Sequence, residues 1–289
     1  MHPPSSGDIC PIGVFDSGIG GLSVLKEIHQ LLPHENLIYV GDSAHAPYGD
    51  RSATYVQARS QLIAEFLVDQ GVKAIVIACN TATAEAAELL RETLDIPVIG
   101  LEPAIKPATK LSQSGVIGVL ATKRTINSER LLGLTERYAK GKKVLAQACP
   151  GLVEQVEACE LNSQTTESLL KKYILPLLEQ GADALILGCT HYPFLLPAIR
   201  QIVGHEIKIL ETGRPVAKQL KRVLKQNNLE SQVSNLISDS INNSDYKSRL
   251  SFYNSSTDKQ KHYAMQKLWQ KFGYHSNKES IQISQLLKG

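Results

Sequence analysis

This chain of 289 residues lacks several features, and each absence excludes a class of protein. No apolar run approaches the ~20 residues that cross a bilayer, so a membrane partner is not expected. No long basic run with interleaved aromatic residues occurs and the net charge is only +3, so nucleic acid is not an expected substrate. The first ten residues, MHPPSSGDIC, lack the charged and apolar regions of a signal peptide. We therefore expect a cytoplasmic protein.

The cysteine pattern is also informative through what is missing. The five cysteines are odd in number and lack the spacing of a small disulfide-stabilised domain, so free thiols in a reducing compartment are expected. Neither CxxC nor HxxxH spacing occurs. A catalytic disulfide, or a zinc site built on Cys79, Cys189 and His191, is therefore only weakly supported.

Length and composition favour two globular domains. With 43% hydrophobic and 20% charged residues, the chain resembles ordinary soluble proteins. Short aliphatic runs alternate with amphipathic stretches, a pattern typical of α/β proteins with parallel sheets. Expected strands cover residues 12–15, 37–40, 74–78, 97–100, 116–120, 143–146, 184–187 and 207–210, with a later one in RLSFYNSS. Expected helices cover residues 21–32, 54–70, 82–92, 128–138, 164–180, 194–203 and 262–272. The stretch 275–289 is interpreted as a terminal helix or a frayed tail.

Two phrases of the sequence are nearly the same. LVDQGVKAIVIAC (67–79) and LLEQGADALILGC (177–189) each contain a helix end, a glycine stop, an aliphatic run and a cysteine. IGVFDSG (12–18) likewise matches IGVLATK (117–123). A repeat of ~100 residues is too long for a solenoid unit of ~20–50 residues. The repeat therefore predicts two related α/β domains.

Cys79 and Cys189 are the strongest candidates for chemistry. Each follows an aliphatic run directly and precedes a helix, so each is expected at the sheet edge where substrates bind. A helix N-terminus stabilises a thiolate, which predicts a lowered thiol pKa. A lone cysteine after a strand is more often structural. Two in duplicated phrases favour instead a pair of thiols that flank one substrate, as a cofactor-free racemase requires. The structural interpretation is kept for the others, Cys10, Cys149 and Cys159.

The loop DSGIGG (16–21) follows the first expected strand and opens the first helix. Its glycines allow an anion to approach the backbone closely. As a dinucleotide fingerprint the loop is incomplete, because Ser23 stands at the third glycine position, although Asp42 has the spacing of a ribose contact. Asp16 is interpreted as a helix cap or as a proton-handling group, and Ser17 as a cap or as a donor to a substrate carboxylate.

A second loop, GDSAHAPYG (41–49), follows the second expected strand. Pro47, Tyr48 and Gly49 are expected to present backbone amides and one phenol at the crevice. Turn chemistry alone also accounts for most of this pattern.

Together these motifs resemble a known family. DSGIGGLSVLKEI, YVGDSAHAPYG, ACNTATA, ACPGLVEQVE and LGCTHYPFL occur in this order, and they resemble the glutamate racemases of the cofactor-independent aspartate/glutamate racemase superfamily. The resemblance covers residues 12–225 and returns in RLSFYNSS. It implies two similar flavodoxin-like domains with mostly parallel sheets, related by pseudo-symmetry, and an active site in the cleft between them. The implied first domain combines 10–103 with 210–289 and contains a polar insertion at about 226–248, and the second spans 104–209.

The resemblance also implies an activity, the interconversion of L- and D-glutamate without a cofactor or a metal, supplying D-glutamate for bacterial peptidoglycan synthesis. Cys79 would deprotonate D-glutamate with help from Asp16, and Cys189 would deprotonate L-glutamate. Glu157 and His191 would assist Cys189. The implied substrate-binding residues are Asp16, Ser17, Pro47, Tyr48, Gly49, Cys79, Asn80, Thr81, Thr125, Thr190 and His191.

Three alternatives stay open at this point. The first is a racemase for aspartate or another acidic amino acid, and the second is a decarboxylase of the same superfamily, for which one thiol suffices. The third is a non-catalytic amino-acid sensor that uses the same cleft. A homodimer is a candidate assembly, which the sequence does not determine.

Overall fold

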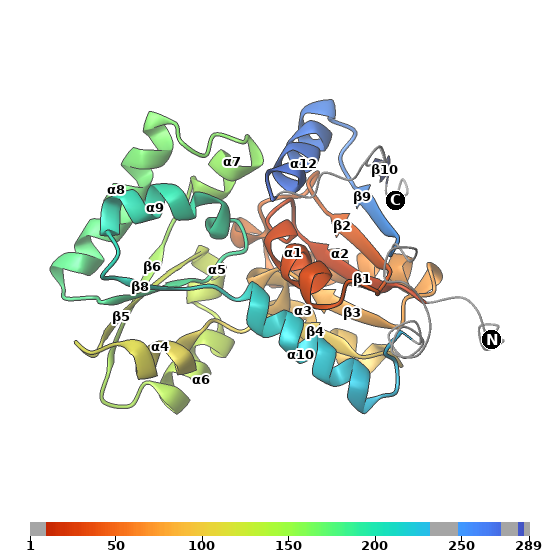
Figure 1. Cartoon of the computed structure of the whole chain (residues 1–289), viewed down its shortest axis with the longest axis horizontal. Coiled ribbons are helices and arrows are strands. Elements are labelled where there is room, and N and C mark those ends of the chain that lie inside the picture. Colours follow the sequence, from red (N-terminus) through yellow and green to blue (C-terminus); the bar gives the residue numbers. More distant parts are fainter. Residues whose placement is uncertain (1–9, 232–247, 273–282, 286–289) are drawn as a thin grey trace, which may run out of the picture.

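The computed structural model describes residues 10–231, 248–272 and 283–285. The first sheet contains β1 (Ile12–Asp16), β2 (Leu37–Gly41), β3 (Ala74–Ile77), β4 (Val98–Gly100), β9 (Leu250–Asn254) and β10 (Ile283–Gln285). The second sheet contains β5 (Val116–Ala121), β6 (Lys143–Ala148), β7 (Ala184–Leu187) and β8 (Lys208–Leu210). Figure 1 shows the two units side by side, with the N-terminal strands in red and orange in one unit and the green segments in the other.

Helices cover both faces of each sheet. The first unit has α1 (Leu22–Leu31), α2 (Ala53–Asp69), α3 (Asn80–Thr93), α10 (Gly213–Gln226) and α12 (Lys259–Lys271), with the short 3-10 helix η1 (Tyr48–Asp50). The second unit has α4 (Ile105–Leu111), α5 (Lys123–Ile126), α6 (Glu129–Tyr138), α7 (Leu152–Glu157), α8 (Gln164–Glu179) and α9 (Leu196–Val203), with the 3-10 helix η2 (Tyr192–Leu195).

The strand orders repeat between the two units. The first sheet runs β10-β9-β2-β1-β3-β4 and the second runs β6-β5-β7-β8, with all described pairs parallel. The segment β2-β1-β3-β4 therefore has the same order as the whole second sheet, which is the order at the start of a flavodoxin-like sheet. This confirms the predicted fold class of two similar, mostly parallel α/β units. The domain limits stay a prediction, and the one between residues 209 and 210 falls within β8.

The duplicated phrases form equivalent structures. Gly71 and Gly181 have φ of +72° and +88° and lie just beyond α2 and α8, where glycine adopts the left-handed conformation without a steric cost. The aliphatic runs that follow are β3 and β7, which are buried completely because helices cover both sheet faces. Cys79 and Cys189 then lie just past the carboxyl ends of these central strands.

Alternate residues of the strands enter different cores. In β1, Val14 packs in a cluster with α1 and α10, while Phe15 packs with α2 and α3. In the second unit, the β7 residues Ala184 and Ile186 face α4 and α6, and Leu185 faces α8 and α9. The cluster around α1 is continuous with the one around α8 and α9, so one apolar core joins the two units.

Among the described residues, the α-helices outside the predicted set are α4, α5, α7 and α10. The helix α10 had a readable signal, because Val216, Leu220 and Leu224 recur at helical spacing and are buried. In the stretch 275–289, the described residues Ile283–Gln285 form the strand β10 beside β9, so a helix is wrong there. Most of the polar insertion lies outside the described residues.

Candidate active site

A narrow cavity lies between the two units, beyond the carboxyl ends of the central strands. Its free volume is only about 10 Å³, which is at the lower limit for a single water molecule. Every predicted substrate-binding residue except Asp16 lines this cavity. The lining residues are Ser17, Pro47, Tyr48, Gly49, Cys79, Asn80, Thr81, Thr122, Thr125, Val153, Gly188, Cys189, Thr190 and His191.

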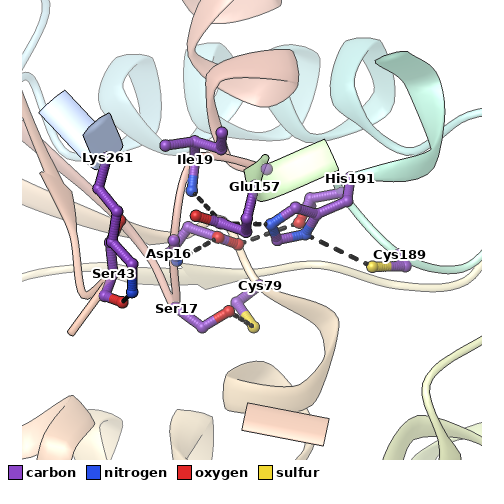
Figure 2. Close-up of polar contacts among 12 residues, drawn as sticks. Asp16, Ser17, Ile19, Ser43, Cys79, Glu157, Cys189, His191 and Lys261 are labelled. Atoms are coloured by element: carbon purple, nitrogen blue, oxygen red, sulfur yellow. Dashed lines mark hydrogen bonds and ion pairs between the residues drawn. The ribbon is translucent and has the colours of Figure 1, made fainter. Parts of the chain in front are cut away.

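Cys79 caps the N-terminus of α3. Its Sγ accepts a hydrogen bond from the backbone N–H of Ala82 at 3.4 Å and lies 3.8 Å from Ser17 Oγ (Figure 2). Burial raises the pKa of the Cys79 thiol to about 12, with a further contribution from the charge of Asp16, and the Ala82 amide opposes this only in part. The predicted lowering of this pKa is therefore wrong in direction, because desolvation outweighs the helix N-terminus.

The contacts of Cys189 differ from those of Cys79. Its Sγ lies 3.7 Å from His191 Nδ1, and His191 Nε2 lies 2.7 Å from Glu157 Oε1 (Figure 2). Burial of His191 opposes its protonation, but the hydrogen bonds and negative charges of Cys189 and Glu157 outweigh that effect and raise the His191 pKa well above its usual range. The imidazole of His191 thus lies between the Cys189 sulfur and the Glu157 carboxylate. The two thiols therefore have different electrostatic surroundings.

Asp16 is fully buried and joins the two units. Its Oδ1 accepts the N–H of Gly18 at 2.8 Å, and its Oδ2 accepts the hydroxyl of Thr190 at 3.0 Å. Burial raises the pKa of Asp16, against the opposing influence of His191 and of the Gly18 amide. The carboxylate acts as a turn cap, and it also interacts electrostatically with Cys79 and His191. Both interpretations of Asp16 are thus compatible with its position.

The glycines of DSGIGG make room for side chains of the other unit. A Cβ at Gly18 would lie 1.9 Å from Glu157 Oε1, and a Cβ at Gly20 would lie 2.3 Å from His191 Nδ1. The Ile19 N–H of this loop donates to Glu157 Oε1 at 2.8 Å, so the group that approaches the loop backbone closely is a carboxylate of the other unit.

A cluster of three hydroxyls closes another side of the cavity. Thr81 Oγ1 lies 2.9 Å from Thr122 Oγ1 and 3.3 Å from Thr125 Oγ1, and the Thr122 and Thr125 hydroxyls lie 3.0 Å apart. Thr122 was missed in the sequence. The repeat contained the signal, because alignment of IGVLATK with IGVFDSG places Thr122 opposite Ser17.

Two lining side chains differ in their available polar atoms. The amide Oδ1 and Nδ2 of Asn80 are buried and have no hydrogen-bond partner among the described residues. Buried polar groups are normally paired, so this amide is suited to a ligand. Tyr48 instead directs its hydroxyl to Asp42 Oδ2 at 2.5 Å. Tyr48 therefore lines the cavity, as expected, while its hydroxyl is engaged by Asp42.

Three further features of the described part of the chain concern thiols, metal ions and membranes. All five cysteines are free thiols. No cluster of three or more His, Cys, Asp or Glu side chains within residues 10–231, 248–272 and 283–285 has an arrangement that could hold a metal ion. None of the described helices combines the length and apolar character needed to cross a bilayer.

Each of the two similar α/β units contributes a buried cysteine to one cavity. Together with the comparisons below, this arrangement defines an amino-acid racemase, which is an isomerase. The chain belongs to the Asp/Glu/Hydantoin racemase family, and the sequence profile of that family matches residues 12–236. A glutamate racemase from Ectopseudomonas mendocina (strain ymp) is 54% identical over 220 residues, which are 76% of this chain and 84% of that protein.

Solved structures agree with this assignment. A glutamate racemase isoform from Bacillus anthracis has a TM-score of 0.80 at 33% identity, with 96% of this chain and 97% of that chain covered. Glutamate racemase from Francisella tularensis in complex with D-glutamate has a TM-score of 0.77 at 31% identity, with 96% and 98% covered. These similarities extend over both units.

Proposed function

We propose that this protein interconverts L- and D-glutamate without a cofactor, with Cys79 and Cys189 acting as two bases on opposite faces of the substrate. The observation that carries the proposal is the placement of both buried thiols at the same cavity, each after an equivalent strand. Similarity to glutamate racemases, one of them bound to D-glutamate, supports the substrate.

The two thiols must hold different numbers of protons when a substrate binds. Inversion removes the α-proton from one face and delivers a proton to the other, and two fixed groups avoid a large movement of either. With its pKa near 12, Cys79 keeps its proton and is suited to deliver it. Cys189, beside the charged His191, is suited to accept one. With Cys189 as the base and Cys79 as the acid, the reaction runs from L- to D-glutamate.

The reverse direction requires the opposite proton distribution. Cys79 then removes the α-proton of D-glutamate and Cys189 delivers one from the other face. Because racemisation has an equilibrium constant of one, each thiol must serve both as acid and as base. Glu157 and His191 assist Cys189, while Asp16 interacts electrostatically with Cys79.

Neutral donors would stabilise the carbanion formed in either direction. Its negative charge spreads into the substrate carboxylate, and no lysine or arginine occurs among the residues that line the cavity. The Asn80 amide and the hydroxyls of Ser17 and the threonine cluster are therefore the available donors, in the manner of an oxyanion hole. Fixed neutral dipoles need little reorganisation during the reaction.

The free volume of about 10 Å³ is too small for glutamate, so the units must separate to admit it. Several hydrogen bonds cross between them at the site, in addition to those of Thr81 with Thr122 and Thr125. Thr190 Oγ1 donates to Asp16, Ile19 N donates to Glu157, and Ser23 Oγ donates to the Thr190 carbonyl. Opening must break at least some of these bonds, and closing restores the catalytic contacts and excludes water.

The wider role follows from the product. We propose that D-glutamate made by this protein supplies bacterial peptidoglycan synthesis in the cytoplasm, which is consistent with the bacterial sources of its relatives. A homodimer remains a prediction, and light scattering on the purified full-length chain tests it.

One experiment tests the activity directly. The full-length protein is incubated with L-glutamate in D₂O, and circular dichroism and the α-proton NMR signal are followed together. We expect loss of optical activity together with α-deuteration, unaffected by chelators and carbonyl reagents and abolished by thiol alkylation. A bound ligand that neither exchanges nor racemises would overturn the proposal in favour of a sensor. Faster reaction with L-aspartate would reassign the substrate.

A further inference from the structure

Asp42 is a fully buried carboxylate for which the proposed mechanism has no use. It follows β2 directly and lies outside the set of residues that line the cavity. Arg59 on α2 binds it through two hydrogen bonds, Nε to Oδ2 and Nη2 to Oδ1, both 2.9 Å long. Tyr48 donates its hydroxyl to Asp42 Oδ2 at 2.5 Å. One carboxylate thus connects an interior ion pair to a cavity residue.

The ion pair between Arg59 and Asp42 fixes the orientation of the Asp42 carboxylate. The Arg59 side chain is 14% exposed and Asp42 is not exposed at all, so the pair is screened little by solvent. A two-bonded guanidinium and carboxylate pair fixes direction as well as charge. Burying such a pair brings little net stability over apolar residues of the same size. Its presence beside the cavity is therefore better explained by what it positions.

Tyr48 connects Asp42 to the substrate cavity. Tyr48 is 1% exposed, lines the cavity and begins η1, between Pro47 and Gly49, which also line it. A Cβ at Gly49 would lie 2.8 Å from Thr122 Cβ, so this segment also packs closely against the hydroxyl cluster of the second unit. A shift of Tyr48 would therefore displace both a substrate-binding segment and its contact across the cavity.

We propose that Asp42 and Arg59 are positioning residues of the substrate site, which hold Tyr48 and segment 47–49 against the substrate without touching it. This inference rests on the proposed racemisation of glutamate. Segment 47–49 binds the substrate before and during the reaction alike, so its displacement weakens binding of both states. KM should rise for both enantiomers while kcat changes little. Because the equilibrium constant is one, kcat/KM must fall equally in the two directions.

The test compares three variants with a matched control. Arg59→Gln removes the guanidinium and its positive charge. Arg59→Lys keeps the charge but not the pair of parallel hydrogen bonds to the carboxylate. Tyr48→Phe removes only the hydrogen bond from the hydroxyl to Asp42. The control is Lys73→Gln, because Lys73 and Glu35 form another buried ion pair of the first unit, 2.5 Å long, away from the cavity. KM and kcat are measured with L- and D-glutamate, and urea unfolding verifies that each variant is folded.

We expect KM to rise about tenfold or more in Arg59→Gln and by a smaller factor in Arg59→Lys. In Tyr48→Phe the expected rise is about fivefold, the value of one ordinary hydrogen bond. Lys73→Gln should lose stability without a change in KM. An unchanged KM in folded Arg59→Gln and Tyr48→Phe, or an equal rise in Lys73→Gln, would overturn the inference, and Tyr48→Phe decides if Arg59→Gln does not fold. An inactive parent protein would instead contradict the proposed function.

Discussion

Glu157 and His191 share a short hydrogen bond of 2.7 Å, and the same carboxylate oxygen accepts the backbone N–H of Ile19 from the other unit at 2.8 Å. Glu157 therefore holds the imidazole beside Cys189 and at the same time connects the two units. The orientation of the imidazole and one contact between the two units therefore depend on the same oxygen atom.

Glu157→Gln should separate these two roles. The amide oxygen can still accept from Ile19, but the negative charge that keeps His191 protonated is gone. We expect kcat to fall about a hundredfold and the pH profile of kcat to shift. Steady-state kinetics over a range of pH measures this. Glu154→Gln on the same helix is the matched control, and a similar loss there would contradict the role of Glu157.

Stability should depend on pH through His191. Its pKa is raised in the folded state, whereas in the unfolded chain it is about 6.5. Below that pH both states are protonated and the stabilisation by His191 is complete. As pH rises above it, the unfolded state loses the proton first, so the stabilisation declines until the folded pKa is passed.

Urea unfolding of the parent and of His191→Gln between pH 6 and 8 tests this sign. The difference in free energy of unfolding should decrease with pH, with a slope of at most about 1.4 kcal/mol per pH unit. A difference that increases with pH would show that His191 is neutral in the folded protein.

Gly18→Ala should damage the site more than the fold. The added Cβ would lie 1.9 Å from Glu157 Oε1, so either the carboxylate moves away from His191 or the units separate. We expect kcat/KM to fall below about 1% of the parent value, as measured by circular dichroism of the reaction. Gly133→Ala in the exposed part of α6 is the control, since nothing lies within 4 Å of its new Cβ. It should be fully active and about 0.5–1 kcal/mol more stable.

Single cysteine variants should fail in different ways. In Cys79→Ser, Cys189 can still remove the α-proton of L-glutamate and return a solvent deuteron to the same face. We therefore expect α-deuteration of L-glutamate without racemisation, while D-glutamate is inert, and the opposite pattern in Cys189→Ser. NMR in D₂O distinguishes the four combinations. If both variants exchange the α-proton of the same enantiomer, the assignment of one thiol to L-glutamate and the other to D-glutamate is wrong.

Much of this architecture was predictable from local signals. Gly71, Gly181 and the aliphatic runs after them specify equivalent helix ends and buried strands, so the two cysteines could be placed at sheet edges from the sequence alone. Those signals act over a few residues. The match between IGVFDSG and IGVLATK extended them to the second unit.

Features that depend on distant contacts could not be read in the same way. The glycines at 18 and 20 make room for Glu157 and His191, which are more than 130 positions away in the chain. The direction of the Cys79 pKa shift depends on its burial, and the Tyr48 hydroxyl donates to Asp42, which Arg59 also binds. In each case a partner outside the motif decides the outcome.

The small volume of the closed cavity has a consequence for successive turnovers. In the proposed mechanism, Cys79 has given up its proton and Cys189 has gained one when D-glutamate leaves, so the empty protein would differ from the form that accepted L-glutamate. A cavity of about 10 Å³ leaves almost no solvent to reset the two thiols once the units close. The proposed mechanism therefore predicts two empty forms, one for each enantiomer released, and at high substrate concentration their interconversion, rather than the chemistry on glutamate, would limit the net rate.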